Sequence, residues 1–273
     1  IIQGVAEFLP ISSSGHLALF QTFFGMENME EKYMFFTVLL HFGTLISVCM
    51  VYWRDIVDMI REFFLGIAAL AGRKDTGVAP PPARRMVMLI IIATVPLFVM
   101  VFLQDAVNQL FSNSIMVSCA LLATGFILFF SDRMARGHKT AKNATVADAL
   151  IVGCGQALAV IPGLSRSGTT ISVGMMRGFD RAFAVRFSFL MSLPAVLGAN
   201  VLEIKDALAS NFPIEELPMY LVGVAVSAVV GYFAIRLVKS LSDKGKFGKF
   251  AYYCWAVGLG SLVAGIVKMM LLK

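Results

Sequence analysis

The sequence predicts an all-α integral membrane protein with six transmembrane helices plus two re-entrant helix–loop–helix hairpins related by an inverted repeat. Three observations support this fold class. The 273-residue chain has a mean hydropathy of +0.81 and only 15% charged residues, whereas soluble domains carry about 25%. Apolar segments long enough to cross a bilayer recur along the chain. Two further apolar stretches are broken by Pro, Ser and Gly, and irregular backbone at membrane depth needs protein or a watery cavity around it.

Six segments approach the roughly 20 apolar residues that a helix needs to cross about 30 Å of hydrocarbon. They are 34–53, 86–103, 115–131, 182–202, 218–239 and 250–271. After the first of them, "IVDMIREFFLGIAALA" sets Asp58, Arg61 and Glu62 at helical spacing among apolar residues. This pattern predicts an amphipathic helix on the membrane surface. The whole chain, 1–273, is expected to form one membrane domain.

Lys and Arg are distributed unevenly among the connections between these segments. Six, four, three and five of them fall in 54–85, 132–148, 177–186 and 236–249, whereas one, none and one fall in 27–33, 104–114 and 203–217. Because cytoplasmic connections collect Lys and Arg, the first group should lie inside and the second outside. The same bias accounts for the net charge of +6 without nucleic acid as a partner.

The stretch 149–176 lies between two connections that are both predicted to be inside, so it must enter and leave the membrane on one side. Residues 1–26 have the same composition, and we predict re-entrant hairpins at both places. A shift of 153 positions pairs Gln3 with Gln156, Ser12 with Ser165, Ser14 with Ser167 and Gly15 with Gly168. An inverted repeat is therefore expected, with copies at about 1–131 and 148–271 and the two loops meeting near the midplane.

Two charges lie inside the apolar hairpins, Glu7 in the first and Arg166 in the second. A charge at the bilayer centre costs at least ~2.5–3.5 kcal/mol on insertion scales. Each of the two residues should therefore form an ion pair or take part in binding or catalysis. A salt bridge that only fixes the packing is one interpretation. A shell of loop hydroxyls favours an oxyanion site instead: Ser12, Ser13, Ser14, Ser165, Ser167, Thr169 and Thr170.

The other residues of the two loops suit the same chemistry. Gly15, Gly163 and Gly168 let backbone N–H groups approach an anion closely. The forked guanidinium of Arg166 suits phosphate. Glu7 has the wrong charge to bind phosphate directly and fits a divalent-metal ligand or a general base.

Three further polar residues lie in or near these segments. His16 follows Ser13 by three residues, on one face of a helical turn, which suggests a nucleophile with a proton carrier. His41, in the segment 34–53, is expected to be a hydrogen-bonded core histidine. Gln156 is expected to support the second hairpin.

Two motifs summarise the hairpins. The first consists of Gln3, Glu7, Phe8, Leu9, Pro10, Ser12, Ser13, Ser14, Gly15 and His16, and the second of Pro162, Gly163, Leu164, Ser165, Arg166, Ser167, Gly168, Thr169 and Thr170. With both motifs at the expected separation, the sequence closely resembles the bacterial undecaprenyl-pyrophosphate phosphatase family, also called the bacitracin-resistance family, over essentially its whole length. Many members have Glu where Gln3 stands, which removes one candidate metal ligand, and Ser14 replaces a common Thr. Members usually have further apolar residues ahead of Ile1.

This resemblance implies hydrolysis of a C55 polyprenyl pyrophosphate to the monophosphate and inorganic phosphate, which recycles the carrier lipid for peptidoglycan synthesis and confers bacitracin resistance. It implies a multi-pass protein of the bacterial cytoplasmic membrane whose active site faces outward. A divalent cation, Mg²⁺ or Ca²⁺, is implied, with Glu7 and Gln3 as candidate ligands. Arg166 would clamp phosphate, and Ser13, His16 or a water molecule would attack phosphorus.

A transporter is the rival class, because inverted repeats and broken helices are typical of carriers. The Glu, Ser and His chemistry discriminates against it, since simple anion binding would not require these groups. The interior glycines of 250–271 permit close helix packing within or between subunits, so a homodimer is one arrangement that the sequence allows.

Overall fold

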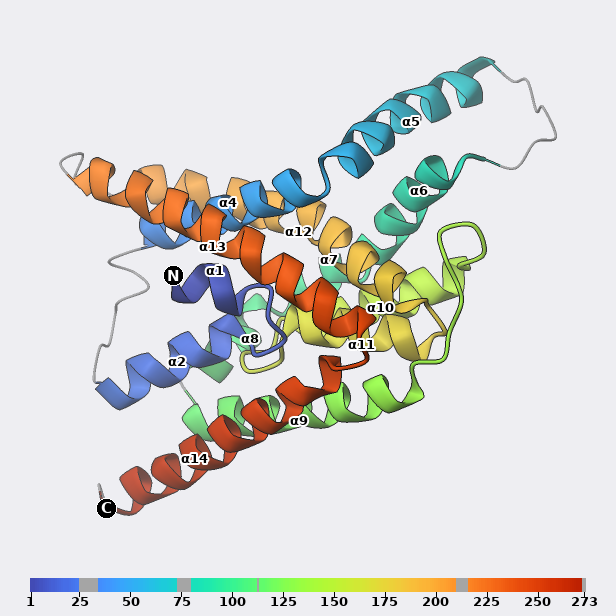
Figure 1. Ribbon diagram of the computed structural model, residues 1–273. Coiled ribbons are helices and arrows are strands. Elements are labelled where there is room, and N and C mark those ends of the chain that lie inside the picture. Colours follow the sequence, from blue (N-terminus) through green and yellow to red (C-terminus); the bar gives the residue numbers. More distant parts are fainter. Residues whose placement is uncertain (25–33, 73–79, 112, 210–215, 272–273) are drawn as a thin grey trace.

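The structure is a computed structural model that describes residues 1–24, 34–72, 80–111, 113–209 and 216–271 (Figure 1). Over these ranges the chain is helical, and its one extended pairing is an isolated bridge between Lys139 and Phe179. The helices are α1 (Ile2–Ala6), α2 (Ser13–Phe24), α4 (Met34–Val51), α5 (Trp53–Gly72), α6 (Pro82–Thr94), α7 (Leu97–Val101), α8 (Gln104–Phe111), α9 (Ser114–Met134), α10 (Val146–Leu158), α11 (Arg166–Met176), α12 (Arg181–Ala209), α13 (Leu217–Asp243), η2 (Phe247–Lys249) and α14 (Phe250–Leu271).

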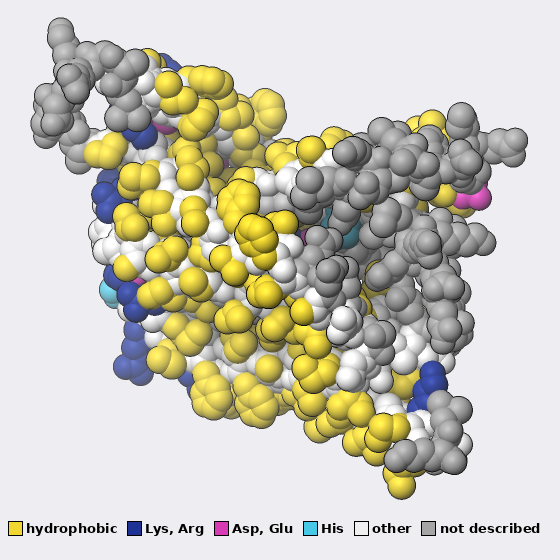
Figure 2. Space-filling view, turned by 180° about the vertical axis from the view of Figure 1, so that it is seen from behind, with side chains coloured by type: hydrophobic (Ala, Val, Ile, Leu, Met, Phe, Trp, Pro, Cys, Tyr) yellow, Lys and Arg dark blue, Asp and Glu magenta, His cyan; other side chains and the backbone are white. Residues whose placement is uncertain are grey.

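Five helices in the described ranges are long and apolar enough to cross a membrane: Pro82–Val101, Ser114–Met134, Arg181–Gly198, Leu217–Asp243 and Phe247–Leu271. A sixth span is counted if the bent pair α4 and α5 is taken as one. Length and composition therefore confirm the all-helical membrane protein and five of the six predicted spans, while 34–53 qualifies only when α4 is counted together with α5. Figure 2 shows hydrophobic side chains covering much of one face, with Lys and Arg gathered along its left edge.

The segment predicted as a surface helix is separate from the span before it. Helix α4 ends at Val51 and α5 begins at Trp53, and the chain bends by 87° between them. Asp58, Arg61 and most apolar side chains of α5 are exposed. Its charged and apolar faces are those expected of a helix at the membrane surface.

Two helix pairs form the outer layers of the molecule, α4 with α13 and α9 with α14 (Figure 1). Hydroxyl groups join the first pair in both directions, because Ser47 Oγ donates to the Ala228 carbonyl (2.8 Å) and Ser227 Oγ donates to the Leu40 carbonyl (3.1 Å). In the second pair Ser118 Oγ and Ser261 Oγ are 2.8 Å apart. Such hydroxyl contacts are a common way for helices to associate in lipid, where the hydrophobic effect does not drive them together.

The glycines of α14 are used mainly within the chain. A Cβ at Gly258 would lie 2.9 Å from the Leu122 side chain, and one at Gly265 would lie 3.1 Å from Ser114 Oγ, both on α9. A Cβ at Gly260 would meet nothing within 4 Å among the described residues. These glycines therefore explain packing inside one subunit, and association into a homodimer stays a prediction.

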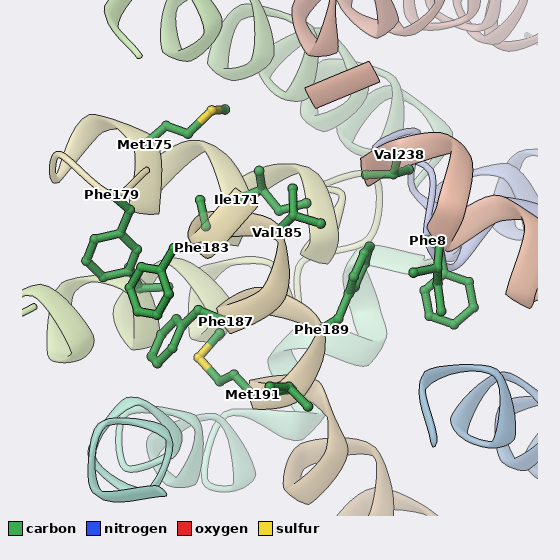
Figure 3. Close-up of a cluster of buried hydrophobic side chains, with 14 of the residues drawn as sticks. Phe8, Ile171, Met175, Phe179, Phe183, Val185, Phe187, Phe189, Met191 and Val238 are labelled. Carbon is green, nitrogen blue, oxygen red and sulfur yellow. The ribbon is translucent and has the colours of Figure 1, made fainter. Parts of the chain in front are cut away.

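The largest buried side chains surround α12 and fix the acid-bearing loop (Figure 3). Phe179, Phe183 and Phe187 form an aromatic cluster with ring centroids 4.8–5.8 Å apart. Further along α12, Phe189 packs edge-to-face on Phe8, with centroids 5.5 Å apart and the planes at 86°. Because Phe8 directly follows Glu7, this contact anchors the first loop to the core.

Both segments predicted as hairpins are helix–loop–helix units lying between the outer layers (Figure 1). The first is α1, the loop 7–12 and α2, and the second is α10, the loop 159–165 and α11. Helix α1 packs on α13, and α11 packs on α9 and α12. Re-entry into the membrane and the inverted repeat of 1–131 and 148–271 stay predictions at this point.

Polar contacts join all four of the connections that were predicted to be cytoplasmic. Asp132 pairs with Arg181 and accepts the Gly248 N–H (2.9 Å). Arg186 pairs with Asp55. Arg85 Nη2 donates to the Ala144 carbonyl at 2.8 Å. The described parts of the four connections are therefore in contact with one another, as expected if they lie on the same side of a membrane.

Asp148, in the connection 132–148, closes the second hairpin. Its fully buried carboxylate, in the first turn of α10, accepts Lys139 Nζ at 2.8 Å and Arg177 Nε at 3.0 Å. Arg177 is the C-terminal cap of α11, so the start and the end of the hairpin are held together. Burial alone would raise the pKa of Asp148, but hydrogen bonds from Lys139, Thr145 and Arg177 lower this pKa to about 2.

Candidate active site

Glu7 lies where the two hairpins meet. Its side chain is 8% exposed and forms an ion pair with Arg166, in which Nη2 donates to Oε1. The other carboxylate oxygen, Oε2, accepts Ser13 Oγ–H at 3.0 Å and Gln3 Nε2–H at 3.1 Å. The acid of the first hairpin and the guanidinium of the second thus converge, together with a hydroxyl group bound directly to the acid.

A cavity of about 290 Å³ opens beside this pair. The first hairpin contributes Ala6, Glu7, Ser12, Ser13 and Ser14 to its wall, and the second contributes Gln156, Ala159, Val160, Leu164, Ser165 and Arg166. The remaining wall comes from spans: His41, Leu97, Ala195, Val196 and Asn200. Four pairs of wall positions are 153 residues apart, namely Ala6 and Ala159, Glu7 and Val160, Ser12 and Ser165, and Ser13 and Arg166.

The second helix of each hairpin begins with the same hydrogen bond. Ser12 Oγ accepts the Gly15 N–H at 3.1 Å, and Ser165 Oγ accepts the Gly168 N–H at 3.1 Å. A serine at this position satisfies backbone donors that would otherwise be unpaired at the helix start. In both loops the hydroxyl of the serine two residues later lies nearby, Ser14 at 3.4 Å and Ser167 at 3.3 Å.

The two loops also touch each other reciprocally. A Cβ at Gly15 would lie 2.8 Å from Gly163 Cα, and a Cβ at Gly168 would lie 3.1 Å from Pro10 Cβ. Positions 10 and 163 are again 153 residues apart. The close approach of the other loop leaves no room for a side chain at Gly15 and makes one at Gly168 tight.

Two residues of the loops have left-handed backbone conformations, Ser12 with a φ of 67° and Gly163 with a φ of 96°. A Cβ at Gly163 would also come within 2.4 Å of the Val117 carbonyl oxygen. Thr124 holds this turn, because its hydroxyl donates to the Gly163 carbonyl (3.0 Å) and accepts the Ser165 N–H (3.1 Å). Sequence reasoning did not identify Thr124, which looks like any small polar residue of a span.

Several residues that line the cavity have buried polar atoms with no hydrogen-bond partner within the described chain. These atoms are Gln156 Nε2 and Oε1, Arg166 Nη1 and Asn200 Nδ2. Buried polar groups are almost always paired in proteins, and unpaired groups gathered around one cavity indicate a polar ligand. Three of the four atoms are N–H donors, which suits an anion.

His41 belongs to this site, contrary to its interpretation as a core residue. Its side chain is 31% exposed, it lines the cavity, and its Nε2 lies 4.0 Å from Glu7 Oε2. Its Nδ1 donates to the Thr37 carbonyl at 3.0 Å, which leaves Nε2 directed at the acid. The sequence signal that could have identified it is an ionisable residue inside a predicted span.

Several predicted site residues do not line the cavity. His16 Nδ1 donates to the Ser12 carbonyl (2.8 Å), and its Nε2 lies 2.8 Å from the Tyr253 hydroxyl. Thr170 donates to the Arg166 carbonyl (2.8 Å), and Ser167 donates to the Leu9 carbonyl (3.4 Å). Among the predicted residues, those absent from the wall are Gln3, Gly15, His16, Gly163, Ser167, Gly168, Thr169 and Thr170.

The described side chains around the cavity offer few ligands for a metal ion. Over the described ranges, no three His, Cys, Asp or Glu side chains gather into a group that could hold a metal ion. Among the described residues, Glu7 is the one carboxylate that lines the cavity, and Gln3 directs its amide N–H at Glu7. This donor set suits Mg²⁺ that is bound mostly by substrate phosphates and water, with one protein carboxylate.

Known proteins that are similar to this chain agree with the family that the two motifs resemble. The sequence model of the family described as "Bacitracin resistance protein BacA" matches residues 1–260. An undecaprenyl-diphosphatase of Alkaliphilus metalliredigens is 41% identical over 94% of this chain and 93% of the relative. Proteins with the same name from Halothermothrix orenii and Methanosphaera stadtmanae are 40% and 38% identical, each over 97% of this chain and 96% and 95% of the relative.

Proposed function

The chain belongs to the bacitracin resistance protein BacA family, and from this membership and the geometry of the site we propose that it hydrolyses undecaprenyl pyrophosphate. The products are undecaprenyl phosphate, which returns to cell-wall synthesis, and inorganic phosphate. One observation carries the proposal. Ser13, Glu7 and Arg166 line one cavity, and in it the Ser13 hydroxyl is bound to the buried Glu7 carboxylate, which is paired with a guanidinium that has a further, unpaired N–H.

The pyrophosphate head group binds in the cavity, where Arg166 is the main anchor. Its Nη2 stays on Glu7, and its Nη1 donates to the terminal phosphate. Gln156 Nε2 and Asn200 Nδ2 supply further donors. Donors held in place before the reaction stabilise the charge that develops in the transition state.

In the proposed reaction, Ser13 Oγ attacks the terminal phosphorus while its proton passes to Glu7 Oε2, 3.0 Å away. The bond between phosphorus and the bridging oxygen breaks, and undecaprenyl phosphate leaves with the bonding electron pair. Glu7 passes this proton to the departing undecaprenyl phosphate. A water molecule then attacks the phosphoserine phosphorus and gives a proton to Glu7, which returns it to Ser13 Oγ as the bond between phosphorus and Oγ breaks and phosphate is released. Direct attack by a water molecule that Glu7 activates is the alternative. His16 is the weakest of the three candidate nucleophiles because both of its nitrogens already have partners outside the cavity.

A divalent cation, Mg²⁺ or Ca²⁺, accompanies the substrate in this proposal. Glu7 would be its main protein ligand, and the side-chain carbonyl of Gln3, whose amide N–H donates to Glu7, is a further candidate. When bound, the cation neutralises pyrophosphate charge.

The membrane arrangement proposed for this site is an inverted repeat with two re-entrant hairpins. Reciprocal contacts between equivalent positions, such as Gly15 with Gly163 and Gly168 with Pro10, are what a two-fold axis between the copies would produce. Asp148, which binds Arg177 at the other end of the second hairpin, supports entry and exit on one side.

The cavity should face the outside of the cytoplasmic membrane. His41 lies in α4 soon after the connection 27–33, and Asn200 lies in α12 shortly before 203–217. Leu97 lies in α7, ahead of 104–114. All three wall residues are thus near connections that the distribution of Lys and Arg places outside. The prenyl tail would extend from the cavity between helices into the lipid.

The experiment that tests this function is phosphate release from undecaprenyl pyrophosphate by the purified protein in detergent, with and without a chelator. We expect release that depends on Mg²⁺ or Ca²⁺ and that falls by at least a thousandfold in Ser13→Ala. A matched control is Ser14→Ala, which removes a neighbouring hydroxyl that does not contact Glu7. Substrate binding without phosphate release by the native chain would favour a carrier, and full activity of Ser13→Ala would favour attack by water.

A further inference from the structure

His16 lies next to the site but acts outside the cavity. Its ring stacks on Tyr253 of α14, with centroids 5.6 Å apart and the planes at 12°. The Tyr253 hydroxyl lies 2.8 Å from His16 Nε2, and His16 Nδ1 lies 2.8 Å from the Ser12 carbonyl oxygen. A carbonyl can only accept, so Nδ1 carries the proton, and in the neutral ring Nε2 accepts the Tyr253 O–H.

The carbonyl that His16 binds belongs to the most unusual backbone position in the loop. Ser12 is the one non-glycine residue among those described that has a positive φ, at 67°. L-residues other than Asn and Asp rarely adopt this conformation, and it persists only where the surroundings hold it. The Ser12 carbonyl accepts both the backbone N–H of His16 (3.2 Å) and its ring N–H.

The second hairpin provides a comparison within the same molecule. Ser165 is the equivalent of Ser12 and makes the same capping bond to a glycine N–H, yet its φ is −74°, an ordinary value. Thr169 stands where the first hairpin has His16, and its backbone N–H still donates to the Ser165 carbonyl at 2.8 Å. The histidine and its tyrosine partner therefore accompany the left-handed backbone and are not needed for the capping bond itself.

The left-handed turn directly precedes Ser13, whose hydroxyl donates to Glu7. A change of φ at Ser12 redirects the chain on either side of it, including the direction in which the Ser13 side chain leaves the backbone. We propose that Tyr253 and His16 form a positioning pair, in which Tyr253 holds the His16 ring and His16 holds the Ser12 carbonyl, so that Ser13 Oγ is aimed at Glu7. This assignment rests on the proposed phosphatase function.

Tyr253→Phe tests the pair, with Tyr252→Phe as the matched control. Tyr252 is the adjacent, exposed tyrosine of α14, and its ring contacts Trp255. Because a small misplacement of a reacting group costs much of the rate, we expect kcat for phosphate release to fall roughly tenfold in Tyr253→Phe while KM changes less than about twofold. Tyr252→Phe should match the native protein in both constants.

Substitutions of His16 separate positioning from chemistry. Asn keeps an N–H donor near the place of Nδ1 but cannot carry a proton or a phosphoryl group as imidazole does. We expect His16→Asn to retain at least a tenth of native kcat and His16→Ala to lose about a hundredfold or more. If His16→Asn is as inactive as His16→Ala, the positioning assignment is wrong.

Hydrogen exchange of the peptide that spans residues 7–16 provides a measurement that does not depend on activity. Exchange should be faster in Tyr253→Phe than in Tyr252→Phe, because the Ser12 carbonyl loses its support. Equal exchange in the two variants, or equal kcat, would overturn the proposal. A native protein that releases no phosphate would instead refute the phosphatase function, and the exchange result would still decide whether the pair positions the loop.

Discussion

Replacing Arg166 with lysine tests whether its guanidinium binds Glu7 and the substrate phosphate at the same time. Arg166 contributes two nitrogens to the proposed site, Nη2 on Glu7 and Nη1, which is buried and has no partner within the described chain. Lysine keeps one positive charge but presents it at a single point, so it cannot pair with Glu7 and extend a second donor to the substrate in the same forked geometry.

The expected loss follows from the number of donors removed. Loss of one preorganised donor to a developing oxyanion costs about 10²–10³ in kcat, or about 2.7–4 kcal/mol. We therefore expect kcat of Arg166→Lys to fall by about 100- to 1,000-fold. Alanine is a poorer test, because it leaves the buried Glu7 carboxylate unpaired, and breaking such a pair costs about 3–5 kcal/mol of stability.

Two measurements on the purified protein check this reasoning: phosphate release under saturating substrate and the thermal unfolding temperature. Arg166→Lys should unfold close to the native temperature, because the charge pair with Glu7 remains. Arg186→Lys is the matched control, since Arg186 pairs with Asp55 at the predicted cytoplasmic end, away from the cavity. A stable Arg166→Lys protein with kcat within tenfold of native would refute the assignment of Nη1 to the phosphate.

Two other predictions concern the fold around the site. Gly163→Ala should destabilise the protein by about 1–3 kcal/mol, because φ is 96° and the new Cβ would lie 2.4 Å from the Val117 carbonyl oxygen. Gly260→Ala is the control and should not destabilise the protein, since a Cβ there meets nothing within 4 Å in the described part of the chain. Equal unfolding temperatures of the two variants would contradict this prediction. The pKa of Asp148 is lowered from its ordinary value of 3.8 to about 2, so its contribution to stability is present above about pH 3.8 and is lost as the pH falls towards 2. Asp148→Asn should flatten that acid limb of unfolding temperature against pH, and an unchanged limb would exclude the ion pairs as its cause.

The convergence of Glu7 and Arg166 could be predicted because a charged side chain in apolar surroundings needs a partner of opposite charge or a polar cavity. An acid and a base in separate hairpins, each too costly to leave in lipid, satisfy each other most easily by meeting. The shift of 153 residues was also visible, and the capping bonds of Ser12 and Ser165 show that identical residues at that spacing do the same work. Composition and spacing were sufficient for these features.

The roles of the histidines could not be predicted from spacing. Ser13 and His16 do share one side of a helical turn, but spacing does not say how that turn is rotated relative to the cavity. The rotation depends on the left-handed backbone at Ser12 and on contact with Tyr253, more than 230 positions away in the chain. His41 was predicted to be a core residue because a single histidine in a span does not indicate which groups will lie near it. The fold brings it close to Glu7.

Two hairpins of similar design that carry different side chains are what the proposed reaction requires. Within the proposed repeat, equivalent wall positions hold Glu7 and Val160, and Ser13 and Arg166. If both hairpins had Glu and Ser at these two positions, two carboxylates would lie near one cavity and no cationic side chain would bind phosphate. If both had Val and Arg, the cavity would bind phosphate but would lack a base. One copy of each places the base and the hydroxyl of the first hairpin directly beside the phosphate clamp of the second. The substrate phosphorus can then lie between attacking oxygen and stabilising guanidinium, and the protein charges of the site nearly cancel before the substrate arrives.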